Sequence, residues 1–139
     1  MKRVLFLCTG NSCRSQMAES ILNELGGGRF EAFSAGSKPA GFVHPLALSL
    51  LRERGYPTDG LRSKSLEEFR QRKFDAVITV CDHAKEACPV WPGASALHWS
   101  FPDPAQAQGS DEQRSAVFRK IFSEIERRLR LFAALPKGG

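Results

Sequence analysis

The sequence predicts a single α/β domain built on a four-stranded parallel sheet, doubly wound, with helices on both faces. Short apolar runs alternate with amphipathic segments of helical period, which is the pattern of β-α-β units. Glycines and prolines fall between these segments, where turns are expected. The length of 139 residues, 42% of them hydrophobic, suits one domain over residues 1–139.

The first predicted unit is a strand, a polar loop and a helix. Residues 4–7 form a continuous apolar run, as expected of a strand buried on both faces. Small polar residues follow, and then an apolar stripe with helical spacing, which three glycines at 26–28 bring to an end. The stripe consists of Met17, Ala18, Ile21, Leu22 and Leu25.

The next segments continue the alternation. Residues 30–35 predict a second strand, and residues 44–54 a second helix. Pro45 falls in the first turn of that helix and Gly55 follows its end, as the helix-terminus preferences require. A short charged helix is expected at 66–72.

The last part of the chain predicts two strands and a long helix. The strands are expected at 74–80 and 96–99, and residues 100–109 form a loop. Ser110 and Gln113 have the spacing of a capping box at the start of the final helix. The apolar face of this helix is Phe118, Ile121, Phe122, Ile125, Leu129 and Phe132.

The charge balance suggests a small anion as ligand rather than nucleic acid. The formal charge is +5, from 20 Lys and Arg against 15 Asp and Glu. The only loose basic cluster, at 120–130, is interrupted by Glu124 and Glu126, so it is better explained as a solvated helix face. The apolar runs are too short for a membrane span or a signal peptide, and a cytoplasmic protein is expected.

A candidate anion-binding loop lies between the first strand and the first helix. Cys8 and Arg14 bracket five residues there. Backbone N–H groups of such a loop can converge on a tetrahedral anion, and an arginine fork can grip two of its oxygens. The positive surroundings favour the thiolate form of Cys8. The alternative is a buried cysteine followed by an ordinary turn. The candidate substrate-binding residues are Thr9, Gly10, Asn11, Ser12, Cys13, Arg14 and Ser15.

Three other cysteines accompany Cys8. Cys13 is interpreted as a packing residue near the helix start, with a redox role as the alternative. Cys81 follows the third predicted strand, at the same sheet edge as the anion loop, and Cys88 comes seven residues later. A zinc site that also uses His83 and His98 is an alternative, but the cysteines lack the close pairing usual for zinc. No metal is expected.

Asp103 is the candidate general acid. It lies between two prolines in the loop before the last helix. A carboxyl group above a bound anion can protonate a leaving oxygen. The alternative is a simple turn, in which Asp-Pro is common.

The segment VLFLCTGNSCRSQMAE, from Val4 to Glu19, resembles the signature of the low-molecular-weight tyrosine phosphatase superfamily. It is most similar to the thioredoxin-coupled arsenate reductases of that superfamily, and the likeness continues at 34–36 and 77–103. The resemblance implies that Cys8 attacks arsenate while Asp103 protonates the departing hydroxyl. Cys81 then attacks Cys8 and releases arsenite, and Cys88 attacks Cys81. Thioredoxin reduces the final disulfide, and no metal or organic cofactor is needed.

The resemblance also implies supporting residues beneath the loop. The side-chain chemistry of the loop itself predicts that Asn11 pins the loop from within and that Ser15 donates its hydroxyl to the Cys8 sulfur. Some of these reductases bind potassium through positions that match Asn11, Glu19 and Ser34, together with an acidic residue near position 64. This chain has Lys64 there, so an ammonium group is expected in place of the cation, with a solvent-exposed lysine as the alternative.

Two other functions compete with arsenate reduction. A low-molecular-weight phosphatase would share Cys8, Arg14 and Asp103 but would not use Cys81 and Cys88. Phosphatases of this superfamily typically carry an aromatic residue after Asp-Pro, where this chain has an alanine. A non-catalytic thiol protein that binds arsenite or another anion is the third hypothesis. A weak phosphatase side activity, with phosphate as an arsenate analogue, and a monomeric state are expected.

Overall fold

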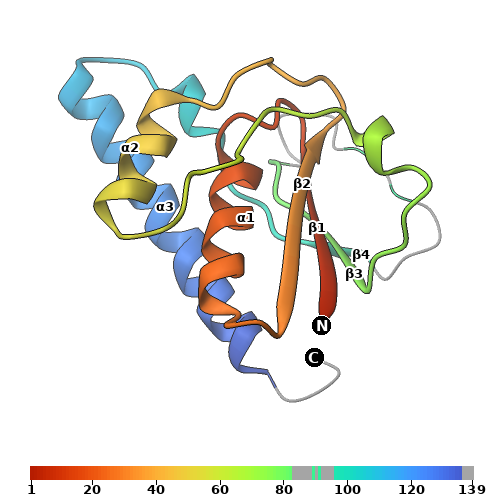
Figure 1. The fold of residues 1–139 in the computed structure, drawn as a ribbon. Coiled ribbons are helices and arrows are strands. Elements are labelled where there is room, and N and C mark those ends of the chain that lie inside the picture. Colours follow the sequence, from red (N-terminus) through yellow and green to blue (C-terminus); the bar gives the residue numbers. More distant parts are fainter. Residues whose placement is uncertain (83–88, 90, 92–95, 136–139) are drawn as a thin grey trace.

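The strands form one parallel sheet, as the sequence predicts. The computed structural model describes residues 1–82, 89, 91 and 96–135. The described strands are β1 (Lys2–Cys8), β2 (Phe30–Gly36), β3 (Ala76–Thr79) and β4 (Ala96–His98). They lie in the order β2-β1-β3-β4, and every pair is parallel. The carboxyl ends of β1 and β2 therefore share one edge, which is the upper edge in Figure 1.

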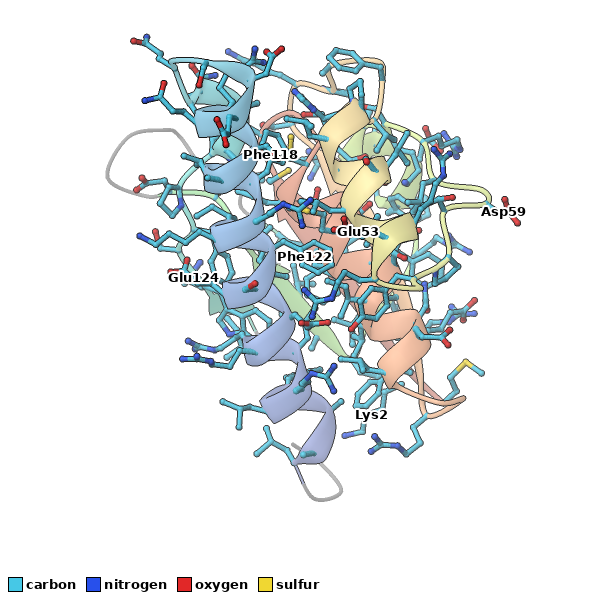
Figure 2. The ribbon with its side chains drawn as sticks, turned by 90° about the vertical axis from the view of Figure 1, so that its left-hand side faces the viewer. Lys2, Glu53, Asp59, Phe118, Phe122 and Glu124 are labelled. Atoms are coloured by element: carbon cyan, nitrogen blue, oxygen red, sulfur yellow. The ribbon has the colours of Figure 1, made fainter. Side chains whose placement is uncertain are left out.

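Three α-helices cover one face of this sheet. They are α1 (Arg14–Leu25), α2 (Pro45–Glu53) and α3 (Asp111–Ala134). Figure 1 shows them together on the left of the strands. In Figure 2, Phe118 and Phe122 point from α3 toward the other two helices, where Phe118 contacts His44 and Phe122 contacts Tyr56. None of the helices in the described part of the chain has the length and apolar character needed to cross a membrane.

The other face is covered differently from the prediction. The charged segment expected as a helix at 66–72 forms a short 3₁₀ helix, η1 (Leu66–Phe69). Only Leu66 and Phe69 are buried in it, and a spacing of three matches a 3₁₀ turn better than an α-helix. Leu5, Leu7 and Val77 of the sheet pack against this element. Both sheet faces are thus buried, and the α/β fold class is confirmed.

The ends of the helices follow the expected local chemistry. Ser110 Oγ accepts a hydrogen bond from Gln113 N–H at 3.1 Å, and Gln113 Oε1 accepts one from Ser110 N–H at 2.8 Å. This confirms the capping box of α3. At α2, His44 Nδ1 accepts from Leu46 N–H at 3.1 Å, and Pro45 occupies the first helical position. Residues 136–139 lie outside the described residues.

Candidate active site

The loop from Cys8 to Arg14 joins the end of β1 to the start of α1, where the sequence predicts it. Four of its carbonyl groups turn outward, toward residues 37–44. Successive N–H groups of the 37–44 segment donate to them, at distances between 2.8 and 3.3 Å. The pairs are Ser37 to Cys8, Lys38 to Thr9, Ala40 to Gly10 and His44 to Ser12. In a trans peptide the N–H group points away from the C=O group, so the outward carbonyls turn the loop N–H groups inward.

The sulfur of Cys8 lies on the inner side of this loop. Asn11 N–H donates to Cys8 Sγ at 3.2 Å, and the carbonyl of the same peptide unit, that of Gly10, accepts from Ala40. Ser15 Oγ lies 2.9 Å from Cys8 Sγ and accepts from Asn11 Nδ2 at 2.7 Å. Cys8 is 2% exposed and is a free thiol. The sulfur therefore accepts a hydrogen bond from the Asn11 N–H group and contacts the Ser15 hydroxyl, on the side toward which the loop closes.

Two small or permissive positions allow the loop to close. Asn11 has a φ of 47°, in the left-handed region that asparagine tolerates better than most residues. Gly36, at the end of β2, packs directly against the loop. A Cβ atom at that position would lie 2.5 Å from the carbonyl oxygen of Thr9. The glycine is therefore required for β2 to support the loop.

Arg14 is almost completely buried beside this loop. Its Nη1 donates to the carbonyl of Phe101 at 3.1 Å, and its Nη2 lies 3.7 Å from Asp103 Oδ2. The guanidinium side chain is 3% exposed. Packing and hydrogen bonds thus fix the orientation of a permanent positive charge next to the Cys8 loop.

Asp103 precedes the short helix η2 (Pro104–Gln106) and lines a cavity at the Cys8 loop. Its Oδ1 accepts from Ala105 N–H at 3.0 Å, so the Asp-Pro turn is present. The same carboxylate also pairs with Arg14. A cavity of about 910 Å³ is lined by Asp103 and by Thr9, Gly10, Ser12, His44 and Asp82. Asp103 can therefore form the Asp-Pro turn and still present a carboxyl group to the cavity at the anion loop.

Cys13 is buried next to the loop but differs from Cys8. It is 2% exposed and is a free thiol. Burial is the main cause that raises the pKa of its thiol to about 12, although a hydrogen bond with Ser12 opposes the shift. A neutral thiol of this kind is inert at neutral pH, which agrees with the predicted packing role.

Cys81 lies at the same sheet edge as Cys8. β1 and β3 are neighbours, with Leu7 opposite Thr79, and Val80 N–H donates to the Leu7 carbonyl at 2.9 Å. Cys81 is buried and disulfide-bonded. Cys88 and His83 lie outside the described residues. His98 hydrogen-bonds Thr79, and the described residues contain no group of three metal-ligating side chains.

Lys64 lies beneath the loop and is only 7% exposed, which contradicts the solvent-exposed alternative. Its Nζ is 3.5 Å from Glu19 Oε1 and donates to Ser34 Oγ at 3.4 Å and to the carbonyl of Arg62 at 2.7 Å. Ser34 Oγ in turn donates to Glu19 Oε1 at 2.6 Å. Desolvation lowers the pKa of Lys64, and the Glu19 carboxylate opposes that shift. The ammonium group and Glu19 thus compensate each other in a buried position.

Gln16 is a site residue that the sequence reasoning did not single out. It is fully buried and donates to Asn11 from the first turn of α1. Ser20, one turn later, is also buried and donates to the carbonyl of Pro57. No distinct signal in the sequence marks Gln16, because α1 carries several other polar residues, such as Glu19 and Glu24.

Comparison with known proteins places this geometry in a family. Residues 3–137 match the family described as low molecular weight phosphotyrosine protein phosphatase. An arsenate reductase from Halalkalibacterium halodurans is 41% identical over 98% of each chain. The crystal structure of an arsenate reductase from Archaeoglobus fulgidus superposes with a TM-score of 0.80 at 29% identity, covering 95% of this chain and 99% of that one.

A further structural relative is described as a thioredoxin-dependent arsenate reductase from Corynebacterium glutamicum. It superposes with a TM-score of 0.73 at 33% identity. The match covers 95% of this chain and 60% of that one.

Proposed function

The chain belongs to the low molecular weight phosphotyrosine protein phosphatase family as one of its arsenate reductases, and from this premise we propose how its residues perform the reduction. The overall reaction converts arsenate and two thiols into arsenite, one disulfide and water. Cys8, Cys81 and Cys88 supply the thiols in turn, and thioredoxin regenerates them.

One observation carries this proposal. The free thiol of Cys8 lies inside a loop whose N–H groups face inward. Asp103 lines a cavity together with residues of this loop, and the guanidinium of Arg14 lies 3.7 Å from the Asp103 carboxylate. Inward N–H groups and a fixed guanidinium bind the oxygens of a tetrahedral anion. The nucleophile, the anion site and a carboxyl group are thereby brought together.

The first step forms a bond between sulfur and arsenic. The loop residues 9–15 and Arg14 hold the arsenate oxygens, and Cys8 Sγ attacks arsenic. Asp103, in its protonated form, gives a proton to the departing hydroxyl, which leaves as water. The product is a covalent adduct of Cys8 with arsenic still in the +5 state.

The second and third steps are thiolate attacks on sulfur. Cys81 attacks Cys8 Sγ, the sulfur–arsenic bond breaks, and its electron pair stays with arsenic, which leaves as arsenite. Cys88 then attacks Cys81 and restores the free Cys8 thiol. The location of Cys81 after the strand next to β1 supports this order, and so does a structure in which Cys81 is disulfide-bonded while Cys8 is free.

Thioredoxin is proposed as the reductant by similarity to the Corynebacterium glutamicum protein. Because the thiol steps need a reducing compartment, we place the protein in the cytoplasm, and we propose that it acts as a monomer. Weak phosphatase activity is proposed as well, since phosphate has the shape and charge of arsenate. Ala105 follows Asp103 and Pro104, so the cavity lacks an aromatic residue there for a phosphotyrosine ring.

A coupled turnover assay tests the proposed function. With NADPH, thioredoxin reductase and thioredoxin, arsenate will cause continuous NADPH oxidation, and phosphate will not. A phosphatase would instead release phosphate from a monoester without oxidising NADPH. A non-catalytic thiol protein would bind arsenite stoichiometrically and turn over neither substrate.

We expect Asp103→Asn to lower the rate of arsenate reduction by roughly 10²–10⁴-fold, because the amide cannot donate the required proton. Asparagine keeps the side-chain oxygen that accepts from Ala105 N–H, so the turn is preserved. Steady-state rates measured between pH 5 and 9 give the result. An unchanged rate with an unchanged pH profile would leave Asp103 with its turn role only.

We expect the melting temperature of the wild-type protein to be equal in potassium and in tetramethylammonium buffers of the same ionic strength. The ammonium group of Lys64 already compensates Glu19, so a cation has no site to fill. Lys64→Ala should lower the melting temperature, because it removes the positive charge that compensates the mostly buried Glu19 carboxylate, and potassium should then raise the melting temperature by mass action. A potassium-specific rise in the wild type would contradict the proposed replacement.

A further inference from the structure

The side chain of Gln16 makes an unusual set of contacts beneath the anion loop. Its Nε2 atom donates to three oxygens: the main-chain carbonyl of Asn11 at 3.0 Å, Asn11 Oδ1 at 2.9 Å and the carbonyl of Arg62 at 2.6 Å. All three are acceptors, so the amide orientation is fixed with its NH₂ group toward them. The Gln16 Oε1 atom is buried and has no hydrogen-bond partner among the described residues.

This arrangement is a poor choice for stability alone. Burying a carbonyl oxygen without a donor costs free energy, and an apolar side chain of the same length would fill the space without that cost. Gln16 is 0% exposed and shares α1 with the buried residues Met17 and Ala18. The advantage of an amide at this position must therefore come from the hydrogen bonds that its NH₂ group donates.

The NH₂ group holds Asn11, the loop residue in the left-handed conformation. One nitrogen donates to both the main-chain and the side-chain oxygen of this residue, which restrains its ψ and χ angles together. Asn11 Oδ1 also accepts from Lys64 N–H at 2.7 Å. Asn11 in turn aims its own N–H at Cys8 Sγ and its Nδ2 at Ser15 Oγ. The orientation of Asn11 thus determines two of the contacts around the sulfur.

We propose that Gln16 is a positioning residue of the active site, whose NH₂ group holds Asn11 in its left-handed conformation and thereby aims the loop N–H groups at Cys8 and the bound oxyanion. The inference rests on the proposed function only in that the Cys8 loop binds a tetrahedral anion. Gln16 touches neither the sulfur nor the anion, and it acts through Asn11.

Gln16→Met tests this role, because methionine keeps the length of the side chain and removes the donor. Two of the three acceptors keep donors from Lys64: Asn11 Oδ1 from its N–H group and the Arg62 carbonyl from its Nζ. The variant is therefore expected to fold. Asn23→Met is the matched control, since Asn23 lies on the same helix and its amide pairs with Ala32 of β2, away from the loop.

The measurement is the alkylation of Cys8 by iodoacetamide, followed by mass spectrometry, with and without inorganic phosphate. We expect phosphate to protect Cys8 in the wild type. In Gln16→Met the Kd for phosphate should rise by about tenfold, the effect of one lost hydrogen bond, and the midpoint of the alkylation pH profile should move upward. Asn23→Met should leave both values within about twofold of the wild type, even if its melting temperature falls.

Gln16→Glu provides a second readout that does not depend on the methionine variant. At high pH the introduced carboxylate faces three acceptor oxygens, whereas at low pH its protonated form can donate one hydrogen bond. The ratio of its phosphate Kd to that of the wild type should therefore fall as the pH decreases.

Three results would overturn the inference. They are a Gln16→Met variant with the phosphate Kd and alkylation profile of the wild type, a Gln16→Glu Kd ratio that is constant with pH, and equal effects of Gln16→Met and Asn23→Met. Absence of phosphate protection in the wild type itself would be a different failure, because it would remove the anion loop on which the proposed function depends.

Discussion

Cys8→Ser will abolish arsenate reduction and phosphatase activity together, because both reactions begin with attack by the same thiolate. A serine hydroxyl is a much weaker nucleophile than a cysteine thiolate, and we expect a loss of more than about 10⁴-fold in both rates. Cys13 cannot substitute, since burial raises the pKa of its thiol to about 12. Arsenite formation and hydrolysis of p-nitrophenyl phosphate measure the two activities.

Phosphate binding provides the control for this variant. Arg14 and the loop N–H groups do not depend on the sulfur, so Cys8→Ser should still bind phosphate. If either activity persisted above background in a variant that binds phosphate normally, Cys8 would not be the nucleophile.

The variants of Cys81 and Cys88 will separate the reductase from a simple phosphatase. Cys81→Ser should keep phosphatase activity and lose arsenate reduction, because the thiolate that attacks Cys8 Sγ and leaves the electron pair of the sulfur–arsenic bond with arsenic is absent. Cys88→Ser should complete about one turnover and then stop as a Cys8–Cys81 disulfide, since the next exchange step is absent.

Peptide mapping by mass spectrometry after addition of arsenate will identify these disulfides directly. The wild-type protein without reductant should accumulate the Cys81–Cys88 disulfide, and Cys88→Ser the Cys8–Cys81 disulfide. Repeated turnover of Cys88→Ser with thioredoxin at the wild-type rate would contradict the relay and leave Cys88 without a catalytic role.

Much of the fold could be predicted from local patterns. The apolar run at 4–7 lies inside β1, where alternate residues enter the two opposite faces of the core. The Ser110–Gln113 spacing predicts the start of α3, and the structure contains the corresponding capping box. These predictions succeeded because the responsible interactions join residues close together in the chain. The segment at 66–72 was less predictable, because only its packing against the sheet decides how many of its residues are helical.

The candidate site could be predicted only in part. Cys8, Arg14 and Asp103 stand out because the chemistry of each residue is distinctive at the end of a strand or in an Asp-Pro loop. Gln16 and the 37–44 segment do not stand out, because their contribution consists of hydrogen bonds to groups that are brought close only when the chain folds. A glutamine in a helix looks like any other polar helical residue until its partners are known.

Because of the contact between the anion loop and the 37–44 segment, access to the cavity and affinity for the anion depend on different parts of that segment. The segment donates to the loop through main-chain N–H groups, and Pro39, which has no N–H, falls between the donors Lys38 and Ala40. Phe42 of the same segment is exposed and lines the cavity. Substitutions of the side chains in the 37–44 segment can therefore change the entrance to the cavity, while the loop N–H groups that bind the anion keep their positions. Selection can thus act on which molecules reach Cys8 independently of how tightly a tetrahedral anion is held once inside.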